Sequence, residues 1–153
     1  MDLKIYNLHF AVGLFGKPQS CFYAANIERN IDTSGIMLLD YPTFKVVCIG
    51  AKDCNAPVML SIQGDQGCIT VPMPANAMNY FEFVDNNGQK QPFQFEQQHR
   101  MFYEFQQFIQ IIDHQDRKVA EQMLDVSEAV CQLMEQARKQ QGIIFGCEKK
   151  DHF

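Results

Sequence analysis

The stretch "GIMLLDYPTFKVVCIGA", residues 35–51, decides the fold of this chain. It holds two runs of strand-forming residues separated by a Pro-Thr turn. Because side chains alternate across a strand, Ile36 and Leu38 point to one side. Met37 and Leu39 point to the other. Both sides are therefore apolar, whereas an antiparallel sheet with one solvent-exposed face alternates apolar and polar residues.

The same pattern continues on both flanks of the turn. Residues 44–51 and residues 21–27 also place apolar side chains on both sides of their expected strands. Helices can cover one face of such a sheet, and a large exposed apolar patch on the other face marks an interface. We therefore predict a homodimer in which this face packs on a copy of itself. The alternative is that the helices divide between the two faces.

Strand patterns fill the chain from residue 19 to residue 95. "GDQG" at 64–67 and "DNNG" at 85–88 predict tight hairpins, since Asn and Gly tolerate positive φ. Short connections between six or seven strands predict a largely antiparallel sheet of about six strands. Asn30 and Asp32 fall in an expected strand-linking loop, where turn chemistry explains them and contact with a substrate is the alternative.

Helical patterns open and close the chain. The first is predicted over residues 2–15 and the others over residues 96–116 and 116–142, where apolar residues recur at three- and four-residue spacing. Asp116 is the expected N-cap of the last helix and Gly142 its C′ residue. The predicted class is α+β: an open-faced sheet, helices packed on one face and dimerisation through the opposite face.

Composition limits the range of functions. A chain of 153 residues, 46% hydrophobic and 20% charged, predicts one globular domain. A net charge of -5 with scattered basic residues argues against nucleic-acid binding. No apolar run approaches the roughly 18 residues of a membrane span. Six cysteines without a CxxC pattern predict free thiols and a cytoplasmic location, and the four separated histidines predict no metal site.

The first helix carries one polar stripe. At 100° per residue, Asp2, Tyr6, His9 and Gly13 fall together, while apolar residues occupy the remaining circumference. A helix that is apolar on most sides is buried. The stripe is therefore expected to face a cleft or a buried polar network.

The order of these elements resembles the C-terminal domain of the glucose–fructose oxidoreductase / inositol dehydrogenase / MocA family. "MDLKIYNLHFAVGLFGKP" at 1–18 is similar to that family's D-x-G-x-H/Y segment with its "LFG-x-P" ending. "IQGDQGCITV" at 62–71 is similar to its G-x-x-G hairpin, and "ARKQQGIIF" at 137–145 to the end of its closing helix. The likeness covers nearly the whole chain.

The resemblance implies a role for residues 1–153 as the substrate-binding and oligomerisation domain of an oxidoreductase. Family members act with NAD or NADP on a sugar, a polyol or a related hydroxylated small molecule. They bind the nucleotide in an N-terminal Rossmann domain, and no part of this chain matches that domain. The resemblance thus implies that this domain alone binds no cofactor and is inactive without its Rossmann partner.

The resemblance also implies site residues. In the family motif the Asp and the His or Tyr four residues later line the substrate cleft, and these positions are Asp2 and Tyr6 here. Tyr6 is the expected catalytic residue, as a hydroxyl donor or proton relay. Asp2, His9 and Lys4 are expected to bind substrate, although Lys4 stands where the family has glycine. The alternative is a polar stripe buried against the Rossmann domain.

Two readings from other functional classes remain. The chain could be a stand-alone small-ligand-binding module, which requires helices that enclose a cavity. It could also be a purely structural dimerisation domain.

Overall fold

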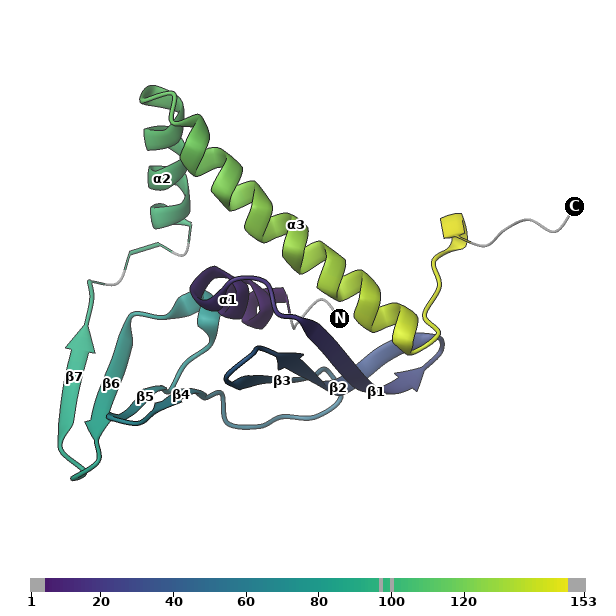
Figure 1. The fold of residues 1–153 in the computed structure, drawn as a ribbon, viewed down its shortest axis with the longest axis horizontal. Coiled ribbons are helices and arrows are strands. Elements are labelled where there is room, and N and C mark those ends of the chain that lie inside the picture. Colours follow the sequence, from purple (N-terminus) through teal and green to yellow (C-terminus); the bar gives the residue numbers. More distant parts are fainter. Residues whose placement is uncertain (1–4, 97, 100, 149–153) are drawn as a thin grey trace, which may run out of the picture. The chain divides into compact units, whose positions relative to one another are not determined.

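The computed structural model describes residues 5–96, 98–99 and 101–148. The chain divides into two compact units, residues 1–55 with 120–153 and residues 56–119, and each is described by itself. Figure 1 labels the elements of both units.

The first unit is built on a three-stranded antiparallel sheet, called here the first sheet. Its strands are β1 (Ser20–Glu28), β2 (Ile31–Asp40) and β3 (Lys45–Ala51), in the order β1-β2-β3. Helix α1 (Ile5–Phe15) precedes the sheet in the chain. Most of α3 (Arg117–Gln140) and the short 3-10 helix η3 (Gly146–Glu148) complete the unit.

One face of the first sheet, its inner face, is covered by helices. Tyr23, Met37 and Leu39 are fully buried there. They share one core cluster with three residues of α1 and four of α3, namely Leu8, Ala11, Val12, Ala129, Val130, Leu133 and Ala137. Full burial of one such side chain contributes about 1.5–3 kcal/mol. The prediction that the helices pack on one face is confirmed for this sheet.

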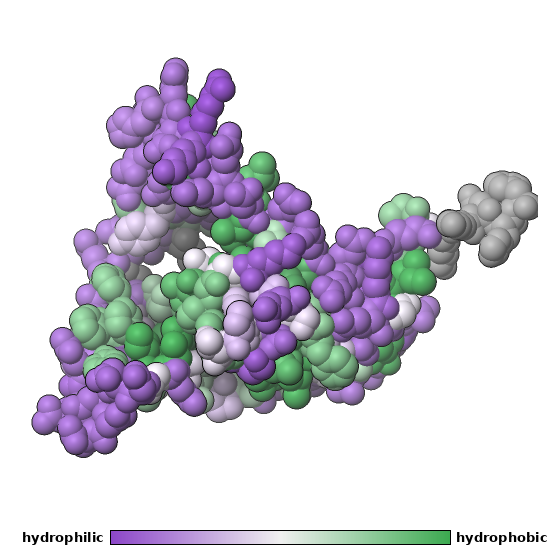
Figure 2. All heavy atoms as spheres, in the orientation of Figure 1, coloured by the Kyte–Doolittle hydropathy of each residue, from purple (hydrophilic) through white to green (hydrophobic). Residues whose placement is uncertain are grey.

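The opposite face of the first sheet, its outer face, is apolar and open. Its exposed side chains are Phe22, Ala24, Ile36, Leu38, Val47 and Ile49. The exposed fraction is 37% for Leu38 and 66% for Ile49. Hydrophobic residues at the surface of this unit are visible in Figure 2 along the strands of the sheet. The two apolar sides expected from residues 35–51 are therefore both present.

The second unit is built on a four-stranded antiparallel sheet, called here the second sheet. Its strands are β4 (Leu60–Gly64), β5 (Gly67–Val71), β6 (Tyr80–Asp85) and β7 (Lys90–Gln94), in sequence order. The short 3-10 helix η2 (Ala75–Ala77) lies before β6, and α2 (Phe102–Asp113) follows β7. Both predicted hairpins are confirmed, and Gly67 and Gly88 have positive φ.

The second sheet alternates apolar and polar residues. The cross-strand register places seven apolar side chains on one face: Leu60, Ile62, Ile69, Val71, Phe81, Phe83 and Phe93. Phe81 stacks on Phe93 with 4.7 Å between ring centroids. The other face includes Ser61, Thr70 and Glu82. This is the pattern of a sheet that needs only one cover.

The structure differs from the expected sheet in two places. The strands form two sheets instead of one, because residues 52–59 after β3 form no strand and no described residue of β3 pairs with β4. The strand-linking loop expected around Asn30 and Asp32 is confirmed for Asn30 and wrong for Asp32. A two-residue turn at Arg29 and Asn30, with φ of 51° and 63°, joins β1 to β2, and Asp32 lies inside β2.

Helix ends follow the predicted capping. The Asp116 carboxylate accepts a hydrogen bond from the Val119 N–H at 3.1 Å, as an N-cap does. Gly142 has a φ of 70°, and the next N–H bonds back to the Arg138 carbonyl at 3.0 Å. Both capping predictions are confirmed.

Candidate substrate-binding face on the first helix

Helix α1 presents Tyr6 and His9 away from the first sheet. The opposite side of the helix carries Leu8, Ala11 and Val12, which are buried in the core. Tyr6 is 49% exposed and His9 is half-buried. Three residues apart on a helix, the two side chains are neighbours on one face. The structure brings these two predicted site residues together.

Asp2 and Lys4, the other two predicted site residues, lie outside the described residues. The place of Asp2 in the polar stripe therefore stays a prediction from the helical pattern, and the role of Lys4 stays one from the resemblance.

Three hydrogen bonds hold α1 in place within its unit. The Tyr41 hydroxyl donates to the carbonyl of Gly16, the residue after the helix, at 2.7 Å. Lys17 donates to the Gln132 side chain at 2.6 Å, and Asn7 reaches the Ile49 carbonyl at 3.5 Å. These bonds tie α1 to the rest of the unit near both of its ends, and the outward face with Tyr6 and His9 is called here the α1 platform.

The polar groups of this platform are available to a ligand. Neither the Tyr6 hydroxyl nor the His9 ring has a hydrogen bond to another described residue. A phenol can donate to and accept from a substrate hydroxyl, and an imidazole can do the same through its two nitrogens. The pair is suited to holding a hydroxylated small molecule.

A second polar cluster lies on the inner face, which the sequence did not predict. The Tyr23 hydroxyl donates to the Asp32 carboxylate at 2.7 Å, and Asp32 is only 8% exposed. Burial, followed by the hydrogen bond to Asp32, raises the pKa of Tyr23 well above its usual range. A β-bulge at Asn26/Ile27 turns Asp32 to this side, and such a bulge leaves no clear mark in a sequence.

Two glutamines of the C-terminal segment complete this cluster. The Gln140 amide accepts from the Tyr23 N–H at 2.8 Å and donates to the Cys21 carbonyl at 2.9 Å. Gln141 donates to the Tyr23 carbonyl. These bonds occupy the free edge of β1, so we assign the cluster a structural role and not a catalytic one.

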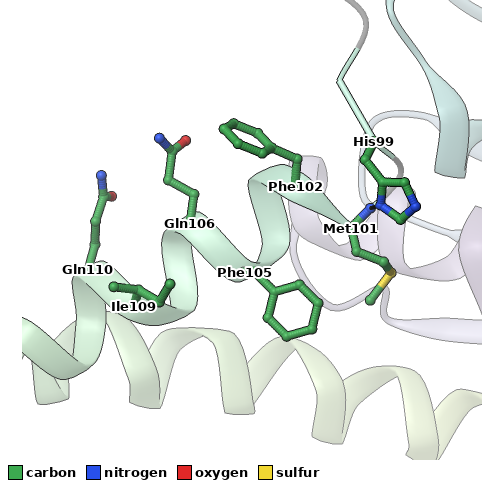
Figure 3. A pocket seen from close by; sticks show the side chains of 7 residues that line it. All are labelled: His99, Met101, Phe102, Phe105, Gln106, Ile109 and Gln110. Atoms are coloured by element: carbon green, nitrogen blue, oxygen red, sulfur yellow. Dashed lines mark hydrogen bonds between the residues drawn. The ribbon is translucent and has the colours of Figure 1, made fainter.

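The second unit carries an apolar hollow of about 560 Å³ along α2. Figure 3 shows Phe102, Phe105 and Ile109 projecting from successive turns of the helix. Among the described residues that line it, His99 is the one ionisable side chain. The described lining therefore offers apolar contact and no pair of ionisable groups of the kind that acid–base chemistry needs.

Other site classes find little support in the described part of the chain. It contains no group of three or more His, Cys, Asp or Glu side chains placed to hold a metal ion. No described helix is both long and apolar enough to cross a membrane. All six cysteines are free thiols; Cys21 and Cys48 are buried, whereas Cys54, Cys131 and Cys147 are exposed.

Comparison with known proteins identifies relatives over nearly the whole chain. The chain is 30% identical over 148 residues to the uncharacterized oxidoreductase YgjR of Escherichia coli, covering 95% of this chain and 44% of that protein. It is 27% identical over 153 residues to the scyllo-inositol 2-dehydrogenase (NADP(+)) IolU of Bacillus subtilis, covering 97% and 46%. The chain thus spans less than half the length of these curated relatives.

Solved structures show the same fold. A candidate oxidoreductase from Klebsiella pneumoniae matches with a TM-score of 0.62 at 17% identity, over 87% of this chain and 46% of that one. One from Yersinia pestis matches with a TM-score of 0.61 at 17% identity, over 95% and 49%. No protein-family model matches the chain. By these relatives and its fold, the chain corresponds to a C-terminal domain of oxidoreductases of the glucose–fructose oxidoreductase / inositol dehydrogenase / MocA type.

Proposed function

We propose that this chain is the substrate-binding half of an NAD(P)-dependent oxidoreductase that acts on a sugar, a polyol or a related hydroxylated molecule. The observation that carries the proposal is the outward face of α1, where Tyr6 and His9 are adjacent and have no partner among the described residues. The relationship to an NADP-dependent scyllo-inositol dehydrogenase supports a polyol as the substrate class.

In this proposal each residue of the α1 face has one task. Tyr6 donates a hydrogen bond to the substrate hydroxyl or relays its proton, and His9 orients the same group. Asp2 and Lys4, the positions that the family resemblance adds, also bind the substrate in this proposal.

The nicotinamide accepts the hydride when it is bound, and a separate nucleotide-binding domain must hold it. Dinucleotide sites lie where a parallel strand meets a helix through a glycine-rich turn. Every strand pair in the described residues is antiparallel, so this chain does not fit such a cofactor. The chain alone is therefore inactive in this proposal.

A chimera tests the proposal directly. The nucleotide-binding half of the Bacillus subtilis relative is fused to this chain, and NADP⁺ reduction is measured with scyllo-inositol and other polyols. We expect turnover from the chimera and none from the chain alone. Tyr6→Phe should lower kcat by about a hundredfold or more, the usual contribution of a positioned acid–base group.

The matched control is Tyr103→Phe, which removes a hydroxyl of the same kind from α2. Tyr103 is 56% exposed and lies in the other unit. Its loss should leave kcat and KM unchanged. Full turnover of the Tyr6→Phe chimera would refute the role of Tyr6. Reduction of NADP⁺ by the chain alone would refute the proposal that a separate domain binds the nucleotide.

We also propose that the chain forms a homodimer through the outer face of the first sheet. Six apolar residues gather on this face, and patches of this kind in soluble proteins mark interfaces. Light scattering at micromolar concentration should give the mass of a dimer. A monomer under these conditions would contradict the proposal.

We also propose a cytoplasmic location, since free thiols agree with a reducing compartment.

A further inference from the structure

A glycine extends the α1 platform towards the C-terminal end of the helix. Gly13 lies two helical turns after Tyr6, so the two residues share a side of α1 and are about 10 Å apart along its axis. His9 lies between them on the same side. Gly13 is exposed, and a Cβ built there meets no atom within 4 Å. The platform therefore continues beyond the Tyr6–His9 pair and ends at an open space.

Neither the backbone nor the packing of the described residues requires a glycine at this position. Gly13 is not among the glycines of positive φ. At Gly35, by contrast, a Cβ would lie 2.5 Å from the Ala24 carbonyl oxygen, so the fold itself excludes a side chain there. Glycine inside a helix is destabilising relative to alanine, because it loses more conformational freedom on folding. A ligand that approaches the helix backbone is a reason to keep a glycine at such a cost.

The character of the platform changes along the helix. The first part presents the Tyr6 hydroxyl and the His9 ring, which have no partner among the described residues. The part around Gly13 is apolar, since Leu14 follows it and is 56% exposed. Phe10, one turn before Gly13, is half-buried. Hydroxyl groups of a ligand suit the first part, and apolar surface suits the second.

The length of the platform limits the kind of ligand that uses all of it. A single six-membered ring with its hydroxyls is shorter than the distance of about 10 Å from Tyr6 to Gly13. A ligand that contacts both parts therefore carries a second group beside its hydroxylated ring. Because the surface around Gly13 is apolar, this second group is apolar as well.

We propose that the α1 platform binds a hydroxylated ring that carries an apolar ring as a substituent, and that Gly13 makes room for the substituent. This inference rests on the proposed function and narrows its substrate class. The hydroxylated ring lies against Tyr6 and His9, and the substituent lies on the helix backbone at Gly13, beside Leu14. Small-molecule sites commonly combine apolar contact with a few placed polar groups. Gly13 is thus a specificity-determining residue, and it takes no part in the chemical step.

Backbone amide chemical shifts of the whole chain test the inference, with the mono-O-benzyl and mono-O-methyl ethers of scyllo-inositol as probes. The two probes share the polyol and the ether oxygen and differ only in the apolar ring. We expect both to shift the amide signals of Tyr6 and His9. The benzyl ether alone should also shift those of Gly13 and Leu14, and it should bind about tenfold more tightly because it buries more apolar surface.

Gly13→Leu removes the open space without weakening the helix, since leucine is a good helix former. This variant should lose the preference of about tenfold for the benzyl ether and bind the methyl ether as the parent does. The matched control is Gln122→Leu, which adds the same side chain at an exposed position of α3 and should keep the preference. A thermal midpoint for Gly13→Leu at or above that of the parent shows that the variant is folded.

The outcomes separate this inference from the proposed function. Shifts at Tyr6 and His9 together with equal affinities for the two ethers would refute the inference while the polyol site stands. A preference for the benzyl ether that survives in Gly13→Leu would also refute it, because the apolar ring would then lie elsewhere. No shift at Tyr6 or His9 with either probe would refute the α1 platform as a polyol site, and the inference with it.

Discussion

The two sheets of this molecule use opposite surface patterns. The first sheet is apolar on both faces, and the helices of its unit cover only the inner one. The second sheet is apolar on one face and polar on the other. A sheet with one polar face can leave that face in water, whereas a sheet with two apolar faces needs two covers. The difference therefore supports the proposal that two copies of the chain pair through the first sheet.

The largest expected effect is on the inner face of the first sheet. Leu39 is completely buried, so Leu39→Ala should lower the free energy of unfolding by about 3 kcal/mol. The adjacent Leu38→Ala, on the outer face, is the matched control and should have a much smaller effect on the unfolding of the monomer. Denaturant titration at low concentration compares them. If both variants lost the same free energy of unfolding, Leu38 would be as buried in the monomer as Leu39, contrary to the structure.

The next effect is on assembly. Leu38→Ser should weaken the proposed dimer by about a hundredfold, because a two-fold interface loses the contact twice and each loss is worth about tenfold. Thr70→Ser, on the polar face of the second sheet, should leave the dissociation constant unchanged. Concentration-dependent light scattering measures both. A larger shift from the Thr70 variant would move the assembly surface to the second sheet.

The third effect is a loss of stability when the buried hydrogen bond between Tyr23 and Asp32 is removed. Tyr23→Phe removes the hydroxyl that donates to Asp32 and leaves a buried carboxylate with one partner fewer. We expect a loss of about 1–2 kcal/mol in thermal or denaturant unfolding. Tyr6→Phe is the control and should change stability little, since the Tyr6 hydroxyl bonds no other described residue. A neutral result for Tyr23→Phe would show that Asp32 is well satisfied without it.

A smaller effect of opposite sign is expected on the α1 face. Gly13 is exposed inside α1, and a Cβ built there meets no atom within 4 Å. Gly13→Ala should therefore stabilise the chain by up to about 1 kcal/mol. Gly35→Ala is the contrast, because its Cβ would lie 2.5 Å from the Ala24 carbonyl oxygen, and it should destabilise. A loss of stability in the Gly13→Ala variant would mean that the added methyl group meets an atom, contrary to the open space around Gly13.

The smallest effect concerns pH. Arg138 forms two hydrogen bonds of 2.6 Å with Glu148, and this contact lowers the pKa of Glu148 from 4.5 to about 2. Since the folded-state pKa is the lower one, its stabilising contribution is complete above pH 4.5 and is lost as the pH falls towards 2. Glu148→Gln should lower the thermal midpoint at pH 7 and match the parent near pH 2. If the two thermal midpoints still differed at pH 2, the lowered pKa of Glu148 would not be the cause of the difference.

Residue alternation predicted the faces of the first sheet because a period of two survives in any register. Leu38 and Leu39 lie on opposite faces as expected. Register itself was harder to predict. The bulge at Asn26/Ile27 moves Asp32 from an expected loop to the buried side of β2, and it depends on tertiary pairing that a single sequence does not display. The division into two sheets depends on the same kind of long-range pairing.

Helical periodicity predicted that Tyr6 and His9 are neighbours, and the roles of these residues stay a prediction. Tyr6 and His9 share the outward face of α1 because residues three apart on a helix are neighbours. Helix ends were predictable at Asp116 and Gly142 because capping is local chemistry. The Gln140 contact with β1 joins residues more than a hundred positions apart, and no local rule indicates it.

The carboxamides of Gln140 and Gln141 have a consequence for aggregation. A bare edge strand is a template onto which other chains can add in register, and β1 is an edge of the first sheet. Because these two side chains already occupy the Cys21 carbonyl and both backbone groups of Tyr23, a strand that adds at this part of the edge would first have to displace them. Proteolytic removal of the residues after Lys139 would expose the template.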